Sequence, residues 1–335
     1  QAGIPDRKNE NYKYTSLTPF LSADYHFVPA GNAGSFELTE AFKCDIPRLD
    51  TILLLVVNGW FHSVSLQGNQ LPEGVLIGSL AEMACKHPEL VNSRYGQLAT
   101  PGGDPMADLN TAWARDGYFI YVPRGVKLEK PVQVINILES DRETFVTQRN
   151  LVIAEPEAEL KLVVCDHTLN LNRYFANTVT EVFTGRNGSV DLCAVQNQHN
   201  LTAAVHAVYH HLERDAHLTT HAVTLHGGMV RNNLKVILDG ENAEANMYGM
   251  AFLDRRQHVD NFLQVVHASP HCLSNQHYKN VLDDAASGAF SGRIHVVRDA
   301  QKTNAYQRNN SLLLTDKALM QAKPQLIIEA DDVKC

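Results

Sequence analysis

Hydrophobic and polar residues alternate along most of the chain after residue 117, in short runs separated by turns. The runs are rich in Val, Leu, Thr and Tyr, and such alternation is typical of strands with one buried face. An earlier apolar run, Ile52–Val57, predicts a buried strand that leads into a turn at Asn58 and Gly59. The later predicted strands are Tyr118–Val122, Val132–Leu138, Leu160–Cys165, Val190–Gln196, Leu218–Leu225, Leu234–Leu238, Ala289–Val297 and Leu326–Glu329.

Helix signals concentrate before residue 117. Ser79 and Glu82 have the spacing of a capping box, in which side chains satisfy the free N–H groups of a first helical turn. Pro88 and Pro105 mark two further helix starts, because a proline at the first helical position loses no hydrogen bond. Gly117 is predicted to stop the last of these helices. We therefore expect a mixed helical N-terminal region at residues 1–117 and a β core at residues 118–335.

The turns between the predicted strands share a form. A polar residue precedes a small one, and an apolar residue follows two positions after the small one. A recurring period of 20–50 residues is a sign of a solenoid. The pattern favours a parallel β-helix, in which each coil buries its inner face against its neighbours, and a large β-sandwich is the alternative. The small residues are Ala158, Gly188, Ala216, Ala243, Gly288 and Ala318, with spacings of 30, 28, 27, 45 and 30.

Charge and composition exclude several classes of protein. The 335 residues include 37 acids and 29 bases, for a net charge of −8, and no segment is rich in Lys and Arg. Binding to nucleic acid phosphates is therefore not expected. No apolar run approaches the roughly 18 residues that a membrane-spanning helix needs. The absence of a signal-peptide pattern and of close cysteine pairs favours a reducing, cytoplasmic compartment.

Histidine is the unusual residue in the composition. Eleven of the 16 histidines lie between His199 and His277, yet no His-Glu-x-x-His or Cys-x-x-Cys spacing accompanies them. We interpret most of them as a polar outer face built by neighbouring coils. Cys272 and His277 are weak candidates for metal binding. Cys335 follows Lys334, whose charge would lower the pKa of the thiol, whereas the charges of Asp331 and Asp332 would oppose that effect.

Two common catalytic motifs are missing from the sequence. It contains no Gly-x-Ser-x-Gly nucleophile elbow and no Gly-Lys-Ser/Thr phosphate loop. We therefore expect a protein that does not itself hydrolyse ATP.

A series of motifs resembles the SufB/SufD family of iron–sulfur cluster assembly proteins, and the resemblance covers nearly the whole chain. Asp331–Cys335, with the sequence Asp-Asp-Val-Lys-Cys, is similar to the SufD branch rather than to the SufB branch. The other matching segments are Pro5–Thr15, Leu238–Glu241, His277–Leu282, Gly288–Ile294, Ala300–Gln307 and Lys323–Leu326.

The resemblance implies a right-handed parallel β-helix with a small N-terminal helical region. It implies a scaffold subunit that is not itself an enzyme, in a complex with SufB and with the ATPase SufC. In that complex the β-helices of SufB and SufD pair. The family's C-terminal helical domain, which contacts SufC, has no counterpart in this sequence, and we expect the chain to have been cut short of that domain. A homodimer is expected where SufB is missing.

The resemblance also implies a transient iron–sulfur cluster at the pairing surface, with none held tightly by this chain alone. Iron–sulfur clusters are held mostly by thiolates, and imidazole can replace thiolate. Of the family's site residues, only Cys335 has a counterpart in this sequence, as a possible cluster ligand. The family's proposed ligand histidine follows this cysteine and is not part of the sequence. The alternatives are a SufB-like cluster scaffold and a polysaccharide-processing enzyme on a parallel β-helix.

Overall fold

The computed structural model describes residues 3–28, 49–66 and 70–335, and strands dominate it. Each strand predicted after residue 117 lies within an observed strand to within one residue. No helix in these ranges combines the length and apolar character needed to cross a membrane. The helical elements are η1 (Glu10–Tyr12), α1 (Thr18–Leu21), α2 (Leu80–Lys86), α3 (Pro88–Asn92) and α4 (Pro105–Trp113).

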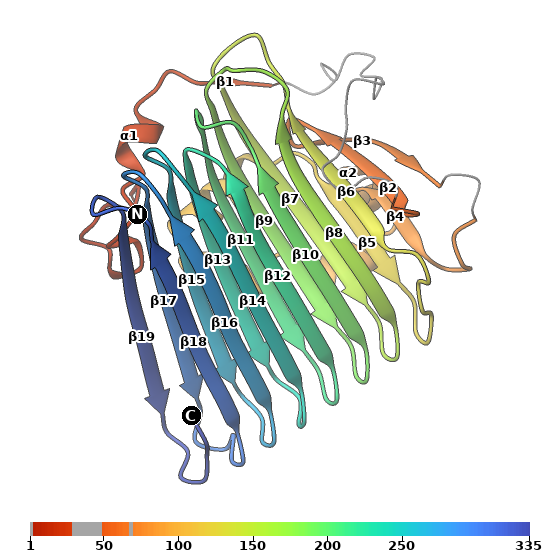
Figure 1. The fold of residues 1–335 in the computed structure, drawn as a ribbon. Coiled ribbons are helices and arrows are strands. Elements are labelled where there is room, and N and C mark those ends of the chain that lie inside the picture. Colours follow the sequence, from red (N-terminus) through yellow and green to blue (C-terminus); the bar gives the residue numbers. More distant parts are fainter. Residues whose placement is uncertain (1–2, 29–48, 67–69) are drawn as a thin grey trace.

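The strands form two long sheets that face each other (Figure 1). Sheet A contains β4 (Leu76–Ser79), β5 (Tyr118–Val122), β7 (Thr144–Ala154), β9 (Tyr174–Thr184), β11 (Thr202–Leu212), β13 (Met229–Leu238), β15 (His258–His267), β17 (Ser287–Val296) and β19 (Leu319–Ile328), with β1 (His26–Phe27) paired to β7. Sheet B contains β3 (Trp60–Ser65), β2 (Ile52–Val57), β6 (Val132–Leu138), β8 (Glu159–Thr168), β10 (Ser189–Asn197), β12 (His217–His226), β14 (Glu244–Leu253), β16 (Leu273–Leu282) and β18 (Asn304–Leu313).

Consecutive strands after β5 alternate between the two sheets, so the chain winds as a coil. Each strand pairs in parallel with the strand two positions along the chain, and the register keeps like positions in line. Val190 of β10, for example, lies between Leu160 of β8 and Leu218 of β12. The fold is therefore a parallel β-solenoid, as predicted, and a β-sandwich of antiparallel strands is excluded.

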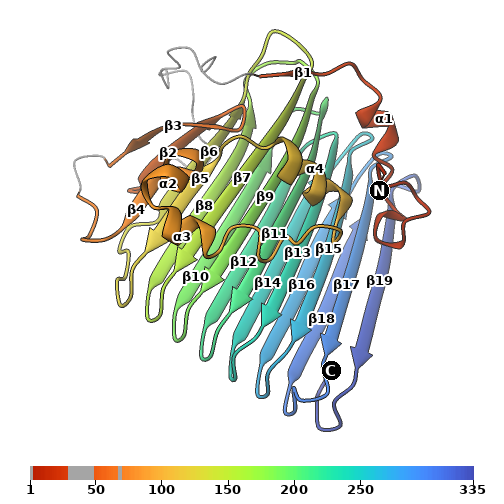
Figure 2. The same cartoon turned by 180° about the vertical axis from the view of Figure 1, so that it is seen from behind.

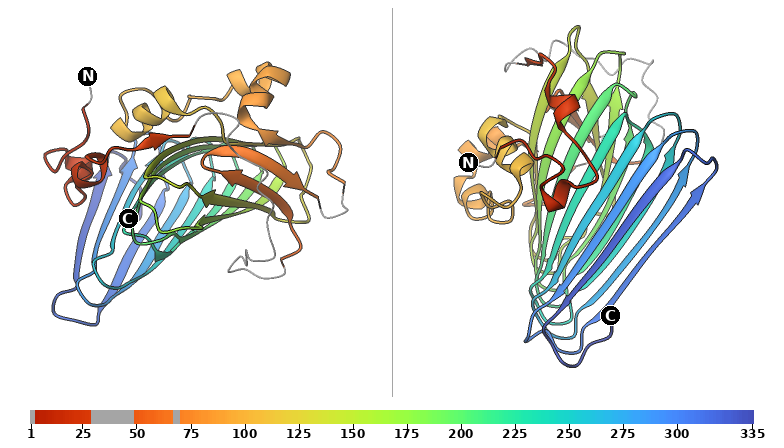
Figure 3. Two further views of the ribbon diagram at one scale, coloured as in Figure 1. Left: turned by 90° about the horizontal axis from the view of Figure 1, so that it is seen from above. Right: turned by 90° about the vertical axis from the view of Figure 1, so that its left-hand side faces the viewer.

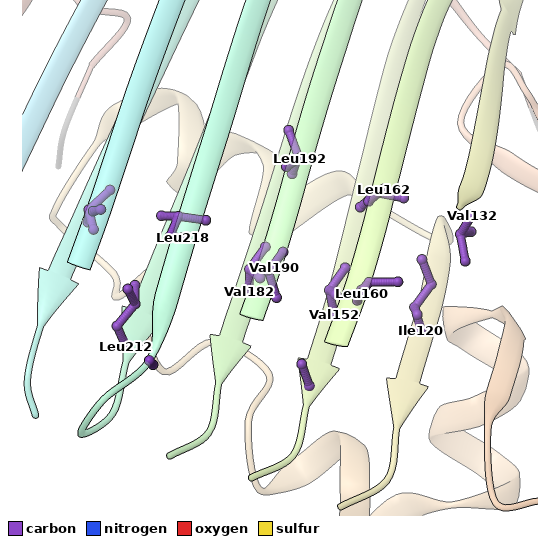
Figure 4. Packing of buried hydrophobic residues seen from close by; sticks show 14 of the residues in the cluster. Ile120, Val132, Val152, Leu160, Leu162, Val182, Val190, Leu192, Leu212 and Leu218 are labelled. Atoms are coloured by element: carbon purple, nitrogen blue, oxygen red, sulfur yellow. The ribbon is translucent and has the colours of Figure 1, made fainter. Parts of the chain in front are cut away.

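The core lies between the sheets, where aliphatic side chains from both sheets meet in stacked columns (Figure 4). Val152 and Val182 of sheet A and Leu160 and Val190 of sheet B are at most 2% exposed. Burial of each such side chain stabilises the fold by about 1.5–3 kcal/mol relative to an exposed position. Every coil contributes to these columns, so no coil can bury its inner face without its neighbours.

The corners that lead from sheet A to sheet B explain the repeat, and they correct the predicted series. At each corner a residue with positive φ precedes a buried residue, which is small in most coils. The buried residues of successive corners are 27 to 31 positions apart. Gly288 is wrong as a member because it lies inside β17, and Ala318 precedes β19 at the opposite corner. The irregular spacing of 45 arises from this mixing of two columns. The true series is Ala158, Gly188, Ala216, Ala243, Cys272 and Thr303.

The helix starts predicted in the N-terminal region are confirmed. The Ser79 side chain accepts a hydrogen bond from the Glu82 N–H, and Pro88 and Pro105 begin α3 and α4. The prediction for Gly117 is wrong, since α4 ends at Trp113. Gly117 instead lies against the next coil, where an added Cβ would stand 1.9 Å from the Arg149 carbonyl oxygen.

The helices and the N-terminal segment cover the outer face of sheet A, as Figure 2 shows from behind and Figure 3 from two further sides. Leu80 and Val91 pack against Phe119 and Phe183 of that face. Four strands from before residue 117 belong to the long sheets, because β1 pairs with β7, β2 with β6, β3 with β2 and β4 with β5. The division at residue 117 stays a prediction.

Candidate functional site

The last coil of the solenoid presents two strand edges. β18 and β19 stand at the ends of sheets B and A, and among the described residues only Lys334 bridges to an outer edge, at Asn304. Unpaired N–H and C=O groups on such an edge can pair with a strand of another chain. The exposed apolar residues on or beside these strands are Tyr306, Leu312, Leu313, Leu314, Leu319, Leu326, Ile327 and Ile328.

Two residues of β19 fit an edge position. Pro324 has no N–H to donate to a neighbouring strand, so proline is confined to edge strands, strand starts and bulges. Lys323, beside it, forms an ion pair with Glu10 of the N-terminal segment. The motif Lys323–Leu326 therefore lies on the outermost strand of sheet A.

Cys335 lies at this same end of the solenoid. The Lys334 N–H donates to the Thr303 carbonyl over 2.8 Å, and the Lys334 carbonyl accepts from the Ala305 N–H over 2.7 Å. These bonds stack the final residues on the last coil and bring Cys335 level with Ala305. Partial burial raises the pKa of the Cys335 thiol, and a backbone hydrogen bond at Ala305 offsets this only in part. The predicted lowering of this pKa by Lys334 is therefore wrong.

Cys272 occupies a structural position in the corner column. Its side chain is fully buried, and its Sγ lies 3.2 Å from the carbonyl oxygen of Gly240, to which it donates. Burial raises the pKa of this thiol, which disfavours the thiolate that a metal would need. A small, apolar thiol suits a place that Ala243 takes in the preceding coil.

His277 lies in the middle of β16 on the outer face of sheet B. Tyr248 of β14 and Arg308 of β18 flank it in the same column. The ring of Tyr248 stacks on His221 with centroids 5.2 Å apart, which extends the column by one strand. The His277 Nε2 atom is buried and has no hydrogen-bond partner among the described residues.

The structure does not bring the three predicted site residues together. At about 3.3 Å per residue along a strand, Cys272 and His277 are about 16 Å apart. His277 lies on the outer face, Cys272 in a corner, and Cys335 at the open end of the coil. The described part of the chain contains no group of three or more His, Cys, Asp or Glu side chains placed to hold a metal ion.

The interpretation of the histidines as an outer face is wrong for His206, His210 and His267. His267 shares a face of β15 with Leu263 and Val265, which pack in the core, and its Nε2 lies 2.9 Å from the Ser274 hydroxyl oxygen. His206 and His210 share a face of β11 with Val208 and Leu212, which pack in the core, so both imidazoles point into the solenoid. His217 and His221 do lie on the outer face of sheet B. A spacing of four residues places His206 and His210 on one face of a strand, but it does not show which face is buried.

The sequence reasoning also missed the strand edges. The run Leu312-Leu313-Leu314 was the available signal, because it breaks the alternation and cannot be buried on one face. This run did not lead to a prediction, because an edge strand is one without a neighbour on one side, and the sequence does not show which strands have neighbours.

Sequence comparisons identify the family. The family profile described as "SUF system FeS cluster assembly, SufBD core domain" matches residues 136–335, and the profile "SufBD protein N-terminal region" matches residues 1–134. The chain belongs to the SufBD family. The sequence resemblance is thereby confirmed, and this family works in the assembly of iron–sulfur clusters.

Relatives from both branches of the SufBD family match along most of the chain. A SufBD family protein of Synechocystis, slr0076, is 27% identical over 99% of this chain and 74% of its own length. SufD of Escherichia coli is 27% identical over the whole chain and 76% of its own length. SufB of Bacillus subtilis is 22% identical over 89% of the chain and 65% of its own length.

Proposed function

We propose that this chain is a SufD-type scaffold subunit that assists iron–sulfur cluster assembly without catalysing a reaction of its own. The observation that carries the proposal is the match of the SufBD core profile to residues 136–335. The SufD assignment draws support from the ending Asp331–Cys335 and from the higher identity to SufD than to SufB.

The proposed main partner is a SufB-type protein, joined through the edges of β18 and β19. Main-chain pairing at an edge supplies affinity, and alternate side chains supply specificity. Leu312 and Leu326 are 57% and 53% exposed and would be buried by such pairing. Without a SufB-type partner, a second copy of this chain would cover the same edges, which gives the proposed homodimer.

The proposed chemistry treats the cluster as cargo rather than as a resident group. Cys335 lies beside the pairing edges, so a thiolate from this chain and ligands from the partner could share one cluster. Its raised pKa keeps the free thiol protonated, and iron must displace that proton on binding. A weakly held cluster suits a scaffold that must release its product.

Two further parts of the proposal rest on the family. A SufC-type ATPase would join the complex through a C-terminal helical domain of the SufD type. The proposed compartment is the cytoplasm, and the free thiols of Cys85, Cys193, Cys272 and Cys335 suit reducing conditions.

A SufB-like role is the second candidate, because the match to SufB of Bacillus subtilis also spans 89% of the chain. The two roles differ in what the chain needs. A SufD-type subunit requires a SufB-type partner to accumulate a cluster, whereas a SufB-like scaffold forms one without it.

The test is reconstitution of the complex from the full-length protein with SufB-type and SufC-type partners under anaerobic conditions. We expect iron and sulfide to accumulate only with the SufB-type partner present, and to fall in Cys335→Ala while the complex stays intact. Cys85→Ala is the matched control, since Cys85 is exposed on α2, far along the chain from the edges. Cluster formation by this chain alone would support the SufB-like role instead.

A further inference from the structure

The interior of the solenoid contains a cavity of about 80 Å³ between sheets A and B. A water molecule needs about 10–15 Å³ of such space, so the cavity has room for about five. It lies among the middle coils, and β5, β11, β12 and β16 all contribute to its walls.

Small side chains create this space. Ala194, Ala222 and Gly249 occupy one inner column of sheet B, where larger side chains would otherwise fill the core. Tyr278 continues this column, and its ring covers Gly249 so closely that a Cβ there would lie 2.0 Å from Cε1. Tyr118, from β5, lines the cavity on the side of the earlier coils. We call this space the interior chamber.

His210 is the residue in the chamber that most clearly lacks hydrogen-bond partners. Its side chain is fully buried, and neither Nδ1 nor Nε2 has a hydrogen-bond partner among the described residues. In its column of sheet A it replaces an aliphatic residue, because Val182 precedes it and Val236 follows it. A buried imidazole with both nitrogens unpaired is costly, so something in the chamber must bond to it.

A second imidazole, that of His206, lines the chamber four residues away on the same strand face. Its Nε2 lies 3.8 Å from Asp166 Oδ2, too far for a hydrogen bond, and is unpaired in the described structure. Asp166 receives a hydrogen bond of 2.8 Å from the Asn136 amide at its other oxygen. A gap of this size between two polar atoms is often bridged by water.

The chemistry of the walls restricts the occupant. Burial lowers the pKa of His210 to about 3, so its imidazole is neutral and offers one N–H donor and one acceptor nitrogen. No Lys or Arg is among the described residues that line the chamber, which disfavours an anion. Asp166, His206 and His210 all line the chamber, but no group of three or more His, Cys, Asp or Glu among the described residues is placed to hold a metal ion, which disfavours a cation. The favoured occupant is therefore small, uncharged, and able both to donate and to accept a hydrogen bond.

We propose that the interior chamber holds ordered water molecules, which hydrogen-bond to the imidazoles of His206 and His210 and to the hydroxyl of Thr220. Thr220 also lines the chamber, from β12. The water satisfies the buried polar atoms that protein groups leave unpaired. The chamber is a hydrated site inside the solenoid core and is separate from the edges of β18 and β19.

A crystal structure of the protein, with a second data set under xenon pressure, tests the proposal directly. We expect water density within hydrogen-bond distance of a His210 ring nitrogen, and no xenon in the chamber. An empty chamber that takes up xenon would show that it is a dry cavity, which overturns the proposal. Density for any occupant other than water would also overturn it.

Deuteron relaxation dispersion, which counts long-lived buried water in solution, gives a second measurement. Ala222→Leu places a larger side chain in the chamber and should reduce the signal by the share of water held there. Val223→Leu, one residue along on the outer face of β12, is the matched control and should leave it unchanged. An unchanged signal in folded Ala222→Leu contradicts the proposal, and if that variant does not fold, the crystal structure decides.

Discussion

The guanidinium of Arg231 lies over the phenol ring of Tyr12, 3.9 Å from its centroid, with both side chains fully buried. Arg231 also forms a buried ion pair with Asp260 and donates to the Asn11 carbonyl over 2.6 Å. Thr15 donates to the same Asp260 carboxylate over 2.6 Å. The N-terminal segment, which resembles a family motif, thus closes over a buried charge pair on the outer face of sheet A.

Truncation of Tyr12 should therefore destabilise the fold. We expect Tyr12→Ala to lower the free energy of unfolding by about 3–5 kcal/mol, because it opens a cavity over buried charges. Tyr12→Phe removes only the hydroxyl that bonds to Asp104, and should cost about 1 kcal/mol. Urea unfolding measures both values. Lys13→Ala, at an exposed neighbour, is the control, and equal losses for Lys13→Ala and Tyr12→Ala would refute the role of this contact.

Gly249 should not tolerate a side chain. A Cβ at this position would lie 2.0 Å from Tyr278 Cε1, so Gly249→Ala should cost about 1–3 kcal/mol through overpacking. The double variant Gly249→Ala with Tyr278→Leu should recover part of that loss, which a double-mutant cycle in urea would measure. Additive losses in the cycle would mean that the two residues do not compete for the same space.

The stability of the protein should fall as the pH drops below about 6.5. Burial lowers the pKa of His210 to about 3 and that of His267 to about 4, whereas both titrate near 6.5 in the unfolded chain. Between these values the unfolded state binds protons that the folded state does not, so stability decreases with falling pH. Each histidine contributes at most about 1.4 kcal/mol per pH unit.

Urea unfolding between about pH 7 and pH 5 measures this slope, in a range where carboxylates contribute little. The variant His210→Val, which extends the valine column of sheet A, should show a shallower slope than the native protein. Parallel slopes for the two proteins would show that His210 is not protonated differently in the folded and unfolded states.

The thiol of Cys335 should react slowly with iodoacetamide near neutral pH. Burial raises its pKa, so the thiolate fraction is smaller than in an ordinary cysteine, and the rate should keep rising above about pH 8.5. Peptide mass spectrometry after timed alkylation provides the rate at this residue. Lys334→Ala should leave the pH profile unchanged, while a plateau below pH 8 or a shift in this variant would contradict the result.

The sequence predicted the solenoid because its signals are local. Alternation identified the strands, and the corner residues Ala158, Gly188, Ala216 and Ala243 lie in register because each coil repeats the same turn. Cys272 was overlooked in that series since a cysteine does not look like a corner residue. Its burial against Gly240 shows that a corner position requires a small side chain and accepts a thiol.

The site was less predictable than the fold because it depends on neighbours in space. Cys335 was found through a family resemblance, but the edges of β18 and β19 are defined by strands that are missing. The inward position of His206 and His210 depends on which sheet face is buried. Asn, Gln and His side chains also occur on the inner face of the solenoid, so the alternation of polar and apolar residues does not show which face is buried.

The central claim is that this SufBD family chain pairs with a SufB-type partner through the edges of β18 and β19. Light scattering after size exclusion, at micromolar concentration, measures that association most directly. We expect the native protein and Leu171→Lys, which changes an exposed leucine between β8 and β9, to form a stable complex. The double variant Leu312→Lys with Leu326→Lys should stay folded but lose the complex. Failure of the native protein to associate, or full association by the double variant, would contradict the claim.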